Sequence, residues 1–268
     1  MFNLKLSSGY EMPFIGLGTW QLEGKKCREI VAKAIEIGYK HIDTAEIYDN
    51  QKEIGKAIKG KREKLFITSK VWFEHLHYQD VLEACEQTLK ELKTDYLDLY
   101  LIHWPNRIVA IEETIKAMKK LLDDGLIRNI GVSNFTINHL KDALKTKVKI
   151  VANQVEFHPY LYQEKLLEFC RKNGIAVIAY SPLGRGNILK DDVLVRIARK
   201  HNKTAAQVCL RWLYQKGIAA IPKSSSVERL KENIDIFDFS LDQKDVKEID
   251  GLNRNIRFVN PVFSDFDY

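Results

Sequence analysis

Short apolar runs alternate with helix-patterned segments along the whole chain of 268 residues. The helical segments carry apolar residues at three- and four-residue spacing, as Val81, Cys85 and Leu89 do. Strict alternation of strand and helix predicts a parallel sheet, because parallel strands need a crossover connection between them. The eight expected strands are Phe14–Gly18, Tyr39–Asp43, Leu65–Lys70, Tyr96–His103, Ile127–Val132, Ile150–Gln154, Ala176–Tyr180 and Ile218–Ile221.

Eight strands in an α/β chain of this length favour one closed (β/α)8 TIM barrel, expected as a single domain over residues 1–268. A doubly wound open sheet is the alternative, but "GLGTWQ" (16–21) lacks the third glycine and the immediate helix of its nucleotide-binding turn. The segment around Ser8-Gly9 predicts an N-terminal β-hairpin, and extra helices are expected at the C-terminal end.

The composition argues against several classes of partner. It is 45% hydrophobic and 29% charged, as in globular proteins with a large core. The net charge of +6 is dispersed, which argues against nucleic-acid binding but favours a phosphate-bearing ligand. There is no signal-peptide pattern and no apolar run of membrane-spanning length, so we expect a cytoplasmic protein without a membrane partner. Short loops predict a monomer.

Motifs for metal or nucleophilic chemistry are weak. The four cysteines show no CxxC spacing and are expected to be buried and reduced. His75 and His77 form the one close histidine pair and have no matching carboxylate, so no metal site is predicted. A GxSxG elbow is missing, which argues against a serine nucleophile.

Polar and aromatic residues follow the expected strands, at the end of a barrel where active sites are built. They are Thr19, Trp20, Asp43, Lys70, His103, Ser133, Asn134, Gln154, Tyr180, Ser181 and Lys223.

The stretch "HIDTAEIYDN" (41–50) contributes an acid and a phenol. Asp43 and Lys70 end neighbouring strands, so the carboxylate is expected to hold the lysine charged. A cation beside the Tyr48 hydroxyl lowers the pKa of that phenol and makes it a candidate general acid. His103, on the next strand, is placed to donate a hydrogen bond to a carbonyl oxygen or to relay the proton.

Each of these residues alone also has an ordinary structural interpretation. Lys70 could cap a strand in solvent, and His103 could be a hydrogen-bonded residue at the edge of the core. Glu46 and Asn50 are expected to have structural roles, in holding the loop and in capping the helix that follows it. Only the combination on adjacent strands favours a proton-transfer site.

Eight motifs in order resemble the aldo-keto reductase superfamily over nearly the whole chain. They are "GLGTW", "HIDTAEIYDN", "TSKVW", "YLDLYLIHWP", "GVSNF", "NQVEFHPY", "AYSPLGRG" and "IPKSSSVERLKENIDIFDFSL". The short length, "AEIYDNQ" and "LIHWPN" are most similar to the compact 2,5-diketo-D-gluconate reductases, which also reduce methylglyoxal.

The resemblance implies a role for each polar residue at the barrel mouth. Tyr48 would be the acid, Lys70 and Asp43 would tune it, and His103 would orient the carbonyl. The nicotinamide would lie on Tyr180, with its carboxamide held by hydroxyl and amide side chains that offer both donors and acceptors. The expected cofactor contacts here are Gly18, Thr19, Trp20, Asp43, Ser133, Asn134, Gln154, Tyr180, Ser181 and Leu183. Singly, "GVSN" and "NQ" are equally consistent with ordinary turn polarity.

The segment "PKSSSVERLKEN" (222–233) resembles the family's grip on the adenosine phosphate. Lys223, Ser224 and Arg229 would surround the 2′-phosphate, and Glu232 and Asn233 would lie near adenine. A lysine, hydroxyls and a guanidinium beside a helix start form an anion site, which predicts NADPH/NADP+ rather than NADH. An ordinary N-capped helix is the alternative.

Trp20, Trp72 and Trp104 follow strand ends and are expected, with Tyr48 and His103, to surround the substrate. An indole wall suits small or aromatic carbonyl compounds, and core packing is the alternative for each. Four aromatic residues of the short tail are further candidates for the lining: Phe258, Phe263, Phe266 and Tyr268.

The leading hypothesis is NADPH-dependent reduction of aldehydes and ketones, such as methylglyoxal, keto sugars and aromatic aldehydes. A barrel aldolase with Lys70 as its Schiff-base lysine is an alternative, against which "GVSN" and "PKSSSVER" argue. A second alternative is a slow NADPH-binding redox sensor that regulates a partner.

Overall fold

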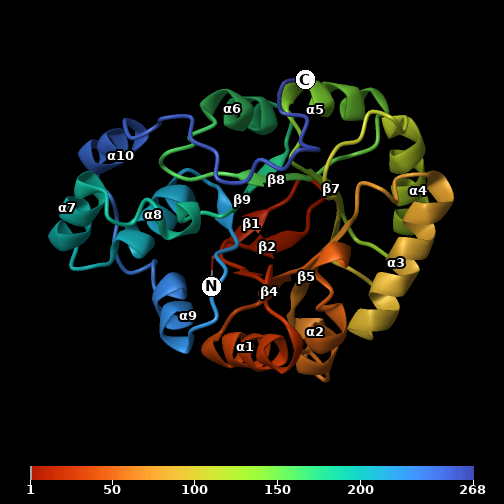
Figure 1. Cartoon of the computed structure of the whole chain (residues 1–268), viewed down its shortest axis with the longest axis horizontal. Coiled ribbons are helices and arrows are strands. Elements are labelled where there is room, and N and C mark those ends of the chain that lie inside the picture. The colour runs from red at the N-terminus through yellow and green to blue at the C-terminus, as the bar shows by residue number, and fades with distance from the viewer. Residues whose placement is uncertain (1) are drawn as a thin grey trace.

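The computed structural model describes residues 2–268, and its eight parallel strands form one sheet in sequence order (Figure 1). Ile15 pairs with Ala220, and Gly18 pairs with Lys223, so the last strand lies beside the first and closes the TIM barrel. The strands are β3 (Leu17–Gly18), β4 (His41–Asp43), β5 (Phe66–Val71), β6 (Leu99–Ile102), β7 (Ile130–Ser133), β8 (Ala152–Glu156), β9 (Ala176–Tyr180) and β10 (Ala219–Ala220).

Helices follow the strands and form the outer layer of the barrel (Figure 1). None of those within residues 2–268 is long and apolar enough to cross a membrane. The α-helices are α1 (Gly24–Ile37), α2 (Gln51–Ala57), α3 (Tyr78–Leu92), α4 (Ile111–Asp123), α5 (Ile137–Lys145), α6 (Glu164–Lys172), α7 (Asp192–Lys200), α8 (Ala205–Gln215), α9 (Val227–Ile234) and α10 (Gln243–Asp250).

The expected strands are confirmed in number and order, but several of their bounds were wrong. The expected strand Tyr96–His103 shrinks to β6, because Leu97 meets its neighbour Ile127 only in an isolated bridge. Strand β8 continues to Glu156, so Gln154 lies inside the strand instead of ending it. Successive residues of a strand point to opposite faces, so residues two apart share a face. The extension therefore adds Glu156 as a second inward-facing residue of β8, two positions after Gln154.

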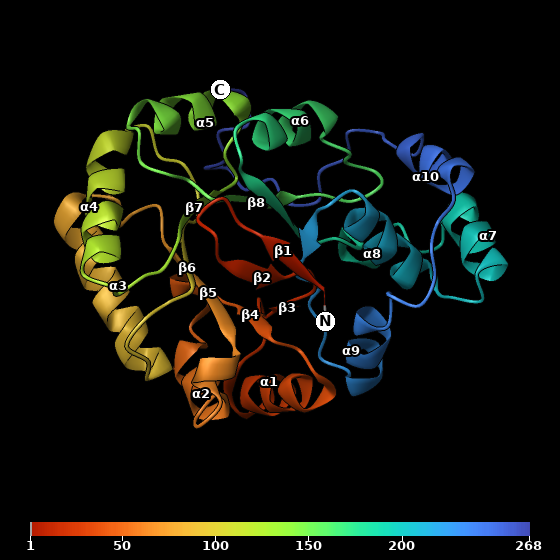
Figure 2. The same ribbon diagram turned by 180° about the vertical axis from the view of Figure 1, so that it is seen from behind.

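The predicted hairpin closes one end of the barrel. Strands β1 (Asn3–Lys5) and β2 (Glu11–Pro13) pair antiparallel and cross the barrel end that faces the reader in Figure 2. Leu6 and Met12 are buried there, in a cluster with residues of the barrel interior such as Leu99 and Leu101. This apolar seal leaves the opposite end, where the strands finish, for polar chemistry.

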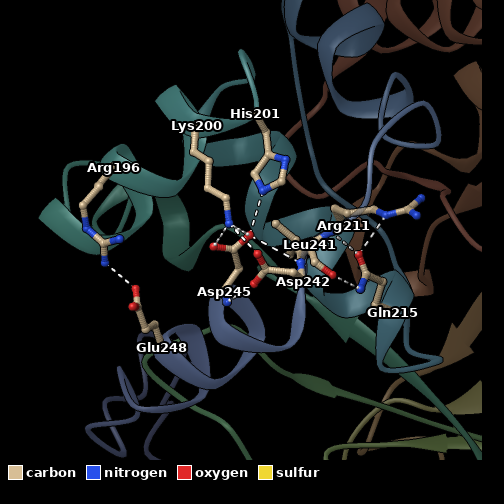
Figure 3. A network of polar contacts seen from close by, with 9 residues as sticks. All are labelled: Arg196, Lys200, His201, Arg211, Gln215, Leu241, Asp242, Asp245 and Glu248. Atoms are coloured by element: carbon tan, nitrogen blue, oxygen red, sulfur yellow. Dashed lines mark hydrogen bonds and ion pairs between the residues drawn. The ribbon is translucent and has the colours of Figure 1, made fainter.

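Helix α10 is held against α7 by a network of charges (Figure 3). Asp245 is buried and accepts hydrogen bonds from Lys200 at 2.9 Å and from His201 at 2.7 Å. Asp242 caps α10 by accepting from the Asp245 backbone N–H at 2.8 Å, and it also accepts from Lys200 at 2.6 Å. The chain that leaves α10 then runs back across the barrel mouth (Figure 1).

The Asp242 carboxylate should make stability depend on pH. The hydrogen bond from Lys200, together with the Asp245 backbone N–H, lowers the pKa of Asp242 to about 2. A lowered folded-state pKa adds stability above the unfolded pKa of about 4 that is lost as pH falls through about 2. Asp242→Asn keeps a capping oxygen but removes the charge. We expect Asp242→Asn to melt at a lower temperature than the unchanged protein at neutral pH, and this difference to shrink as the pH falls below about 4.

The control is Asp95→Asn, which removes an exposed carboxylate that forms no ion pair within residues 2–268. Its melting temperature should follow that of the unchanged protein at every pH. A deficit in Asp242→Asn that stays constant from neutral to acid pH would contradict the role of the charge.

Candidate active site

A buried ion pair lies at the mouth of the barrel. Asp43 ends β4, Lys70 lies one residue before the end of β5, and parallel pairing of these strands brings both side chains to the same end. Lys70 Nζ donates to Asp43 Oδ1 at 2.5 Å, and both residues are at most 1% exposed. The sequence therefore predicted this pairing correctly.

Further hydrogen bonds complete the surroundings of the pair. Gln154 Nε2 donates to Asp43 Oδ2 at 2.7 Å, and Lys70 Nζ also donates to the Thr44 carbonyl oxygen at 2.8 Å. The Thr19 hydroxyl donates to the Asp43 carbonyl oxygen at 2.8 Å. Buried charges are tolerated when their remaining donors and acceptors are satisfied in this way.

Burial acts on the pair in opposite senses. Loss of hydration raises the pKa of Asp43 and lowers the pKa of Lys70, while their mutual attraction opposes both changes and the Gln154 hydrogen bond opposes the change at Asp43. The attraction favours the ion pair, in which the carboxylate and the ammonium compensate one another's charge.

The Tyr48 hydroxyl lies directly beside Lys70. It accepts from Lys70 Nζ at 3.4 Å, and the ammonium also lies 4.9 Å from the centre of the Tyr48 ring. The one-turn helix η1 (Glu46–Tyr48) carries this phenol over the end of β5. Its ring packs between Trp20, at 4.8 Å between centroids, and His103, at 5.6 Å.

The expected lowering of the Tyr48 pKa is wrong for this structure. Burial and the Asp43 carboxylate raise the pKa of Tyr48 well above its usual value. Lys70 cannot reverse this shift, because Asp43 compensates most of its charge and its contact with the phenol is long. Tyr48 is therefore fully protonated at neutral pH, as a proton donor must be before the reaction.

His103 is a neutral imidazole. Burial, and then the Lys70 charge, lower the pKa of His103 well below its usual value. Its Nδ1 atom is buried without a hydrogen-bond partner among residues 2–268. A neutral ring carries one N–H donor, so His103 can orient a carbonyl oxygen without competing with Tyr48 as the acid.

The loop between Asp43 and helix α2 is tied down by side chains. Asn50 does not cap α2 with its side chain, contrary to our prediction; it accepts from the Thr44 hydroxyl at 2.7 Å and donates to the carbonyl oxygens of Thr19 and Leu22. Glu46 accepts from the Trp72 backbone N–H at 2.9 Å, which confirms a role in the loop. These bonds hold both ends of the segment that carries Tyr48.

The residues expected around the nicotinamide carboxamide lie together. Asn134, immediately after β7, has a left-handed φ of 63°, a conformation that asparagine adopts more readily than most residues. Its Oδ1 accepts from the Tyr180 hydroxyl at 2.8 Å, and its Nδ2 donates to the His103 carbonyl oxygen at 3.0 Å. The Ser133 hydroxyl donates to the Gln154 carbonyl oxygen at 2.8 Å. These contacts preorganise an amide beside the Tyr180 ring.

The loop after β9 has an unusual backbone. Ser181 has a φ of 45° and Arg185 a φ of 55°, and left-handed conformations of this kind cost free energy in residues other than glycine. Leu183 is half-buried, and Gly184 with φ 53° leaves no room for a Cβ, which would lie 2.8 Å from Ile188. Such strain is often retained where backbone N–H groups must face a ligand.

Helix α9 begins beside the predicted phosphate site. Ser226 caps it by accepting from the Arg229 backbone N–H, and Ser224 is buried and bonded within the same turn. Lys223 and Arg229 are exposed, and neither forms an ion pair within residues 2–268. The helix is thus capped, as the alternative of an ordinary helix start requires, yet it has one cation in its first turn, Arg229, and one shortly before its cap, Lys223.

The two residues expected near adenine differ in environment. Asn233 is buried on α9. Glu232 is half-buried and accepts from the Thr204 hydroxyl at 2.6 Å, which links α9 to the start of α8.

The three indoles also differ in environment. Trp20 is 43% exposed beside Tyr48, and Trp72 lies 5.3 Å from His103 between ring centroids. Trp104 is buried, and its aromatic neighbours are Phe263 at 5.3 Å and Phe266 at 5.7 Å. Two indoles therefore border the proton-transfer residues, and the third lies beneath the tail.

The tail crosses the mouth and packs there with only part of its predicted aromatic set. Phe263 stacks on Phe73, with 4.5 Å between centroids, and meets Trp72 at 5.5 Å. Phe258 lies instead over His158, and Tyr268 donates to Asp142 on α5 at 2.6 Å.

One site residue was missed by the sequence reasoning. Glu156 at the end of β8 is fully buried, and it accepts from the backbone N–H groups of Phe258 at 2.8 Å and Val259 at 3.0 Å. A carboxylate between the apolar residues Val155 and Phe157, directly after an expected strand, was the available signal, because buried carboxylates are rare without partners.

The arrangement offers proton-transfer chemistry. Within the part of the chain that the structure describes, no group of three or more His, Cys, Asp or Glu side chains could hold a metal ion. The mouth instead combines a neutral phenol, a neutral imidazole and a buried ion pair.

Comparison with known proteins identifies the family. Residues 14–254 match the model of the aldo/keto reductase family. The chain belongs to this family. It is 50% identical over 259 residues to "Glyoxal reductase" of Bacillus subtilis (strain 168), covering 95% of this chain and 94% of that protein.

Two further relatives show how far the similarity extends. The "NADP-dependent D-sorbitol-6-phosphate dehydrogenase" of Malus domestica is 39% identical over 299 residues, covering 96% of each chain. The aldose reductase from Schistosoma japonicum has a similar structure, with a TM-score of 0.92, 39% identity and coverage of 97% of this chain and 94% of that chain.

Asn50→Ala should loosen the loop that carries Tyr48. It removes an acceptor from Thr44 and a donor from two carbonyl oxygens, so we expect a loss of about 1–3 kcal/mol in the free energy of unfolding. Urea titration measures this loss. Asp49→Asn is the matched control, because Asp49 is exposed with a left-handed φ of 49°, which asparagine tolerates. Equal stabilities of the two variants would contradict the assignment.

Proposed function

We propose that this protein reduces aldehydes and ketones to alcohols with NADPH. The proposal rests chiefly on one observation: the Tyr48 hydroxyl lies against Lys70, whose ion pair with Asp43 is buried at the barrel mouth. A protonated phenol beside a buried cation is suited to donate a proton to an oxygen that becomes negative during reaction.

The residues of the mouth would divide the chemistry between them. The carbonyl oxygen would accept hydrogen bonds from Tyr48 and from the neutral ring of His103. When bound, NADPH would supply a hydride to the carbonyl carbon and leave as NADP+. Tyr48 would give its proton to the oxygen, so that C=O becomes CH–OH, and Lys70 would stabilise the resulting phenolate until solvent restores the proton.

The proposed cofactor fits the chemistry of the residues present. Tyr180 offers a ring beside the Asn134 amide, whose oxygen accepts one hydrogen bond from the Tyr180 hydroxyl and keeps a second lone pair for a carboxamide N–H. Within the part of the chain described, Lys223 shortly before the cap of α9 and Arg229 in its first turn have no ion-pair partners. A phosphate monoester would satisfy both charges, which favours NADPH over NADH.

The substrates would be carbonyl compounds that fit between Trp20, Trp72 and the tail. These aromatic surfaces favour flat or small apolar groups. The similarity to a glyoxal reductase supports small dicarbonyl compounds such as methylglyoxal among them.

Tyr48→Phe should nearly abolish turnover. The phenyl ring keeps its packing against Trp20 and His103, but the proton donor is lost, so we expect kcat to fall about 10²- to 10⁴-fold. NADPH affinity, measured by fluorescence titration, should change little. Tyr10→Phe is the control, because Tyr10 is exposed in the hairpin at the other end. Turnover by Tyr48→Phe at the rate of the unchanged protein would rule out Tyr48 as the acid.

Arg229→Gln should weaken NADPH selectively. Loss of a charge-assisted contact costs about 1.5–3 kcal/mol, which corresponds to a rise of roughly 10- to 150-fold in KM for NADPH. The KM for NADH should stay unchanged, because NADH lacks the 2′-phosphate. Lys231→Gln removes another exposed charge from α9 and serves as the control. An equal rise in KM for both cofactors would show that Arg229 contacts a part of the cofactor other than the 2′-phosphate.

A further inference from the structure

The side chain of Glu46 joins two loops of the barrel mouth. Its Oε2 atom accepts from the Trp72 backbone N–H at 2.9 Å, and its Oε1 atom lies 2.5 Å from His75 Nδ1. The barrel does not need this contact, because the strands that precede the two loops, β4 and β5, already pair with each other. Partly exposed contacts between ionisable side chains also add little to folding stability. What the contact can change is the position of one loop relative to the other.

The first of these loops carries the phenol of Tyr48. Glu46 begins the one-turn helix η1 and Tyr48 ends it, so both residues lie in the same turn. The Tyr48 backbone N–H donates to the Ala45 carbonyl oxygen at 3.1 Å, and turns of this type have poor hydrogen-bond geometry. The contact between the Tyr48 hydroxyl and Lys70 is longer, at 3.4 Å, than the bond from Trp72 to Glu46. The Glu46 carboxylate is therefore the firmer attachment of this turn to the segment after β5.

The second loop carries the indole of Trp72, directly after β5. The His75 backbone N–H donates to the Trp72 carbonyl oxygen at 3.0 Å and closes a turn, and Glu46 contacts the first and last residues of this turn. The rings of Trp72 and Tyr48 lie on His103, at 5.3 Å and 5.6 Å between centroids. The two loops that Glu46 joins thus contribute the two aromatic groups that flank the His103 ring.

Glu113 makes the same pair of contacts at a place remote from Tyr48. It accepts from the Tyr78 backbone N–H at 2.9 Å and lies 3.2 Å from His77 Nδ1. These contacts fasten the start of α3 to the first turn of α4, in the outer layer of the barrel. The two carboxylates are alike in bonding and differ in what they hold, so Glu113 provides a matched comparison for Glu46.

We propose that Glu46 is a positioning residue for carbonyl reduction, which fixes the Tyr48 hydroxyl relative to His103 and Trp72. The inference rests on the proposed function and assigns to Glu46 an effect on proton transfer rather than on cofactor binding. A general acid works only within hydrogen-bond reach of the atom that it protonates, and a displacement of about 1 Å can lower a rate about 100-fold. Without the carboxylate, the turn that carries the phenol loses its attachment to the loop of Trp72.

Kinetics of Glu46→Ala and Glu113→Ala test this role. We expect Glu46→Ala to lower kcat for benzaldehyde about 5- to 50-fold and to change KM for NADPH by less than about twofold. A misaligned acid slows proton transfer, so the ratio of kcat in H2O to kcat in D2O should rise. Glu46→Gln keeps an oxygen for the Trp72 N–H and should restore most of the activity. Glu113→Ala should leave both kcat and the isotope ratio unchanged.

A double variant shows whether Glu46 acts through the phenol. When Tyr48→Phe has already removed the proton donor, adding Glu46→Ala should lower kcat further by less than about twofold. A further loss as large as that of Glu46→Ala alone would overturn the proposal. Unchanged kcat in Glu46→Ala, or an equal loss in Glu113→Ala, would overturn it as well.

Hydrogen exchange gives a measurement that does not depend on turnover. The Trp72 backbone N–H, followed by NMR, should exchange at least about tenfold faster in Glu46→Ala than in the unchanged protein, because its acceptor is lost. Unchanged exchange would overturn the proposal even if kcat fell. Absence of carbonyl reduction by the unchanged protein, together with faster exchange in Glu46→Ala, would contradict the proposed function and not the link between the two loops.

Discussion

The buried ion pair of Lys70 and Asp43 is the constraint on which the mouth of this barrel depends. Removing one partner from such a pair leaves an uncompensated charge and costs about 3–5 kcal/mol. The pair therefore requires the surrounding bonds from Gln154 and to the Thr44 carbonyl oxygen. It also places a donor against the Tyr48 hydroxyl, so the same burial that is costly for stability prepares a protonated acid at the centre of the site.

The rest of the fold makes that burial possible. The hairpin closes the opposite end of the barrel with Leu6 and Met12, so water does not approach the pair from below. Above it, Asn50 ties the loop of Tyr48 to the first strand, and the tail crosses the mouth while anchored on Glu156. The backbone after β7 and β9 adopts left-handed conformations at Asn134 and Ser181, and the Asn134 side chain bonds there to Tyr180 and to the His103 carbonyl oxygen.

Alternation of pattern along the chain was enough to predict the barrel, its hairpin and the pairing of Asp43 with Lys70, since these follow from strand order and local periodicity. Contacts set by tertiary structure were harder to predict. Asn50 looked like a helix cap because it precedes α2, yet its side chain bonds to distant carbonyl oxygens. The Tyr48 pKa was predicted in the wrong direction, because one sequence cannot reveal how strongly burial, and then the Asp43 carboxylate, raise the pKa of this phenol. Glu156 binds backbone groups far along the chain, which leave no mark on local sequence.

The most direct measurement follows both hydrogens that reduction would add to benzaldehyde. The reaction is run with NADPH deuterated at one of its two C4 positions, and in a second arm with unlabelled NADPH in deuterated water. Our proposal predicts that one of the two labelled forms transfers deuterium to the carbon of the benzyl alcohol, and that solvent deuterium appears only on its exchangeable oxygen. Solvent deuterium on the carbon, or no transfer from either C4 position, would contradict it.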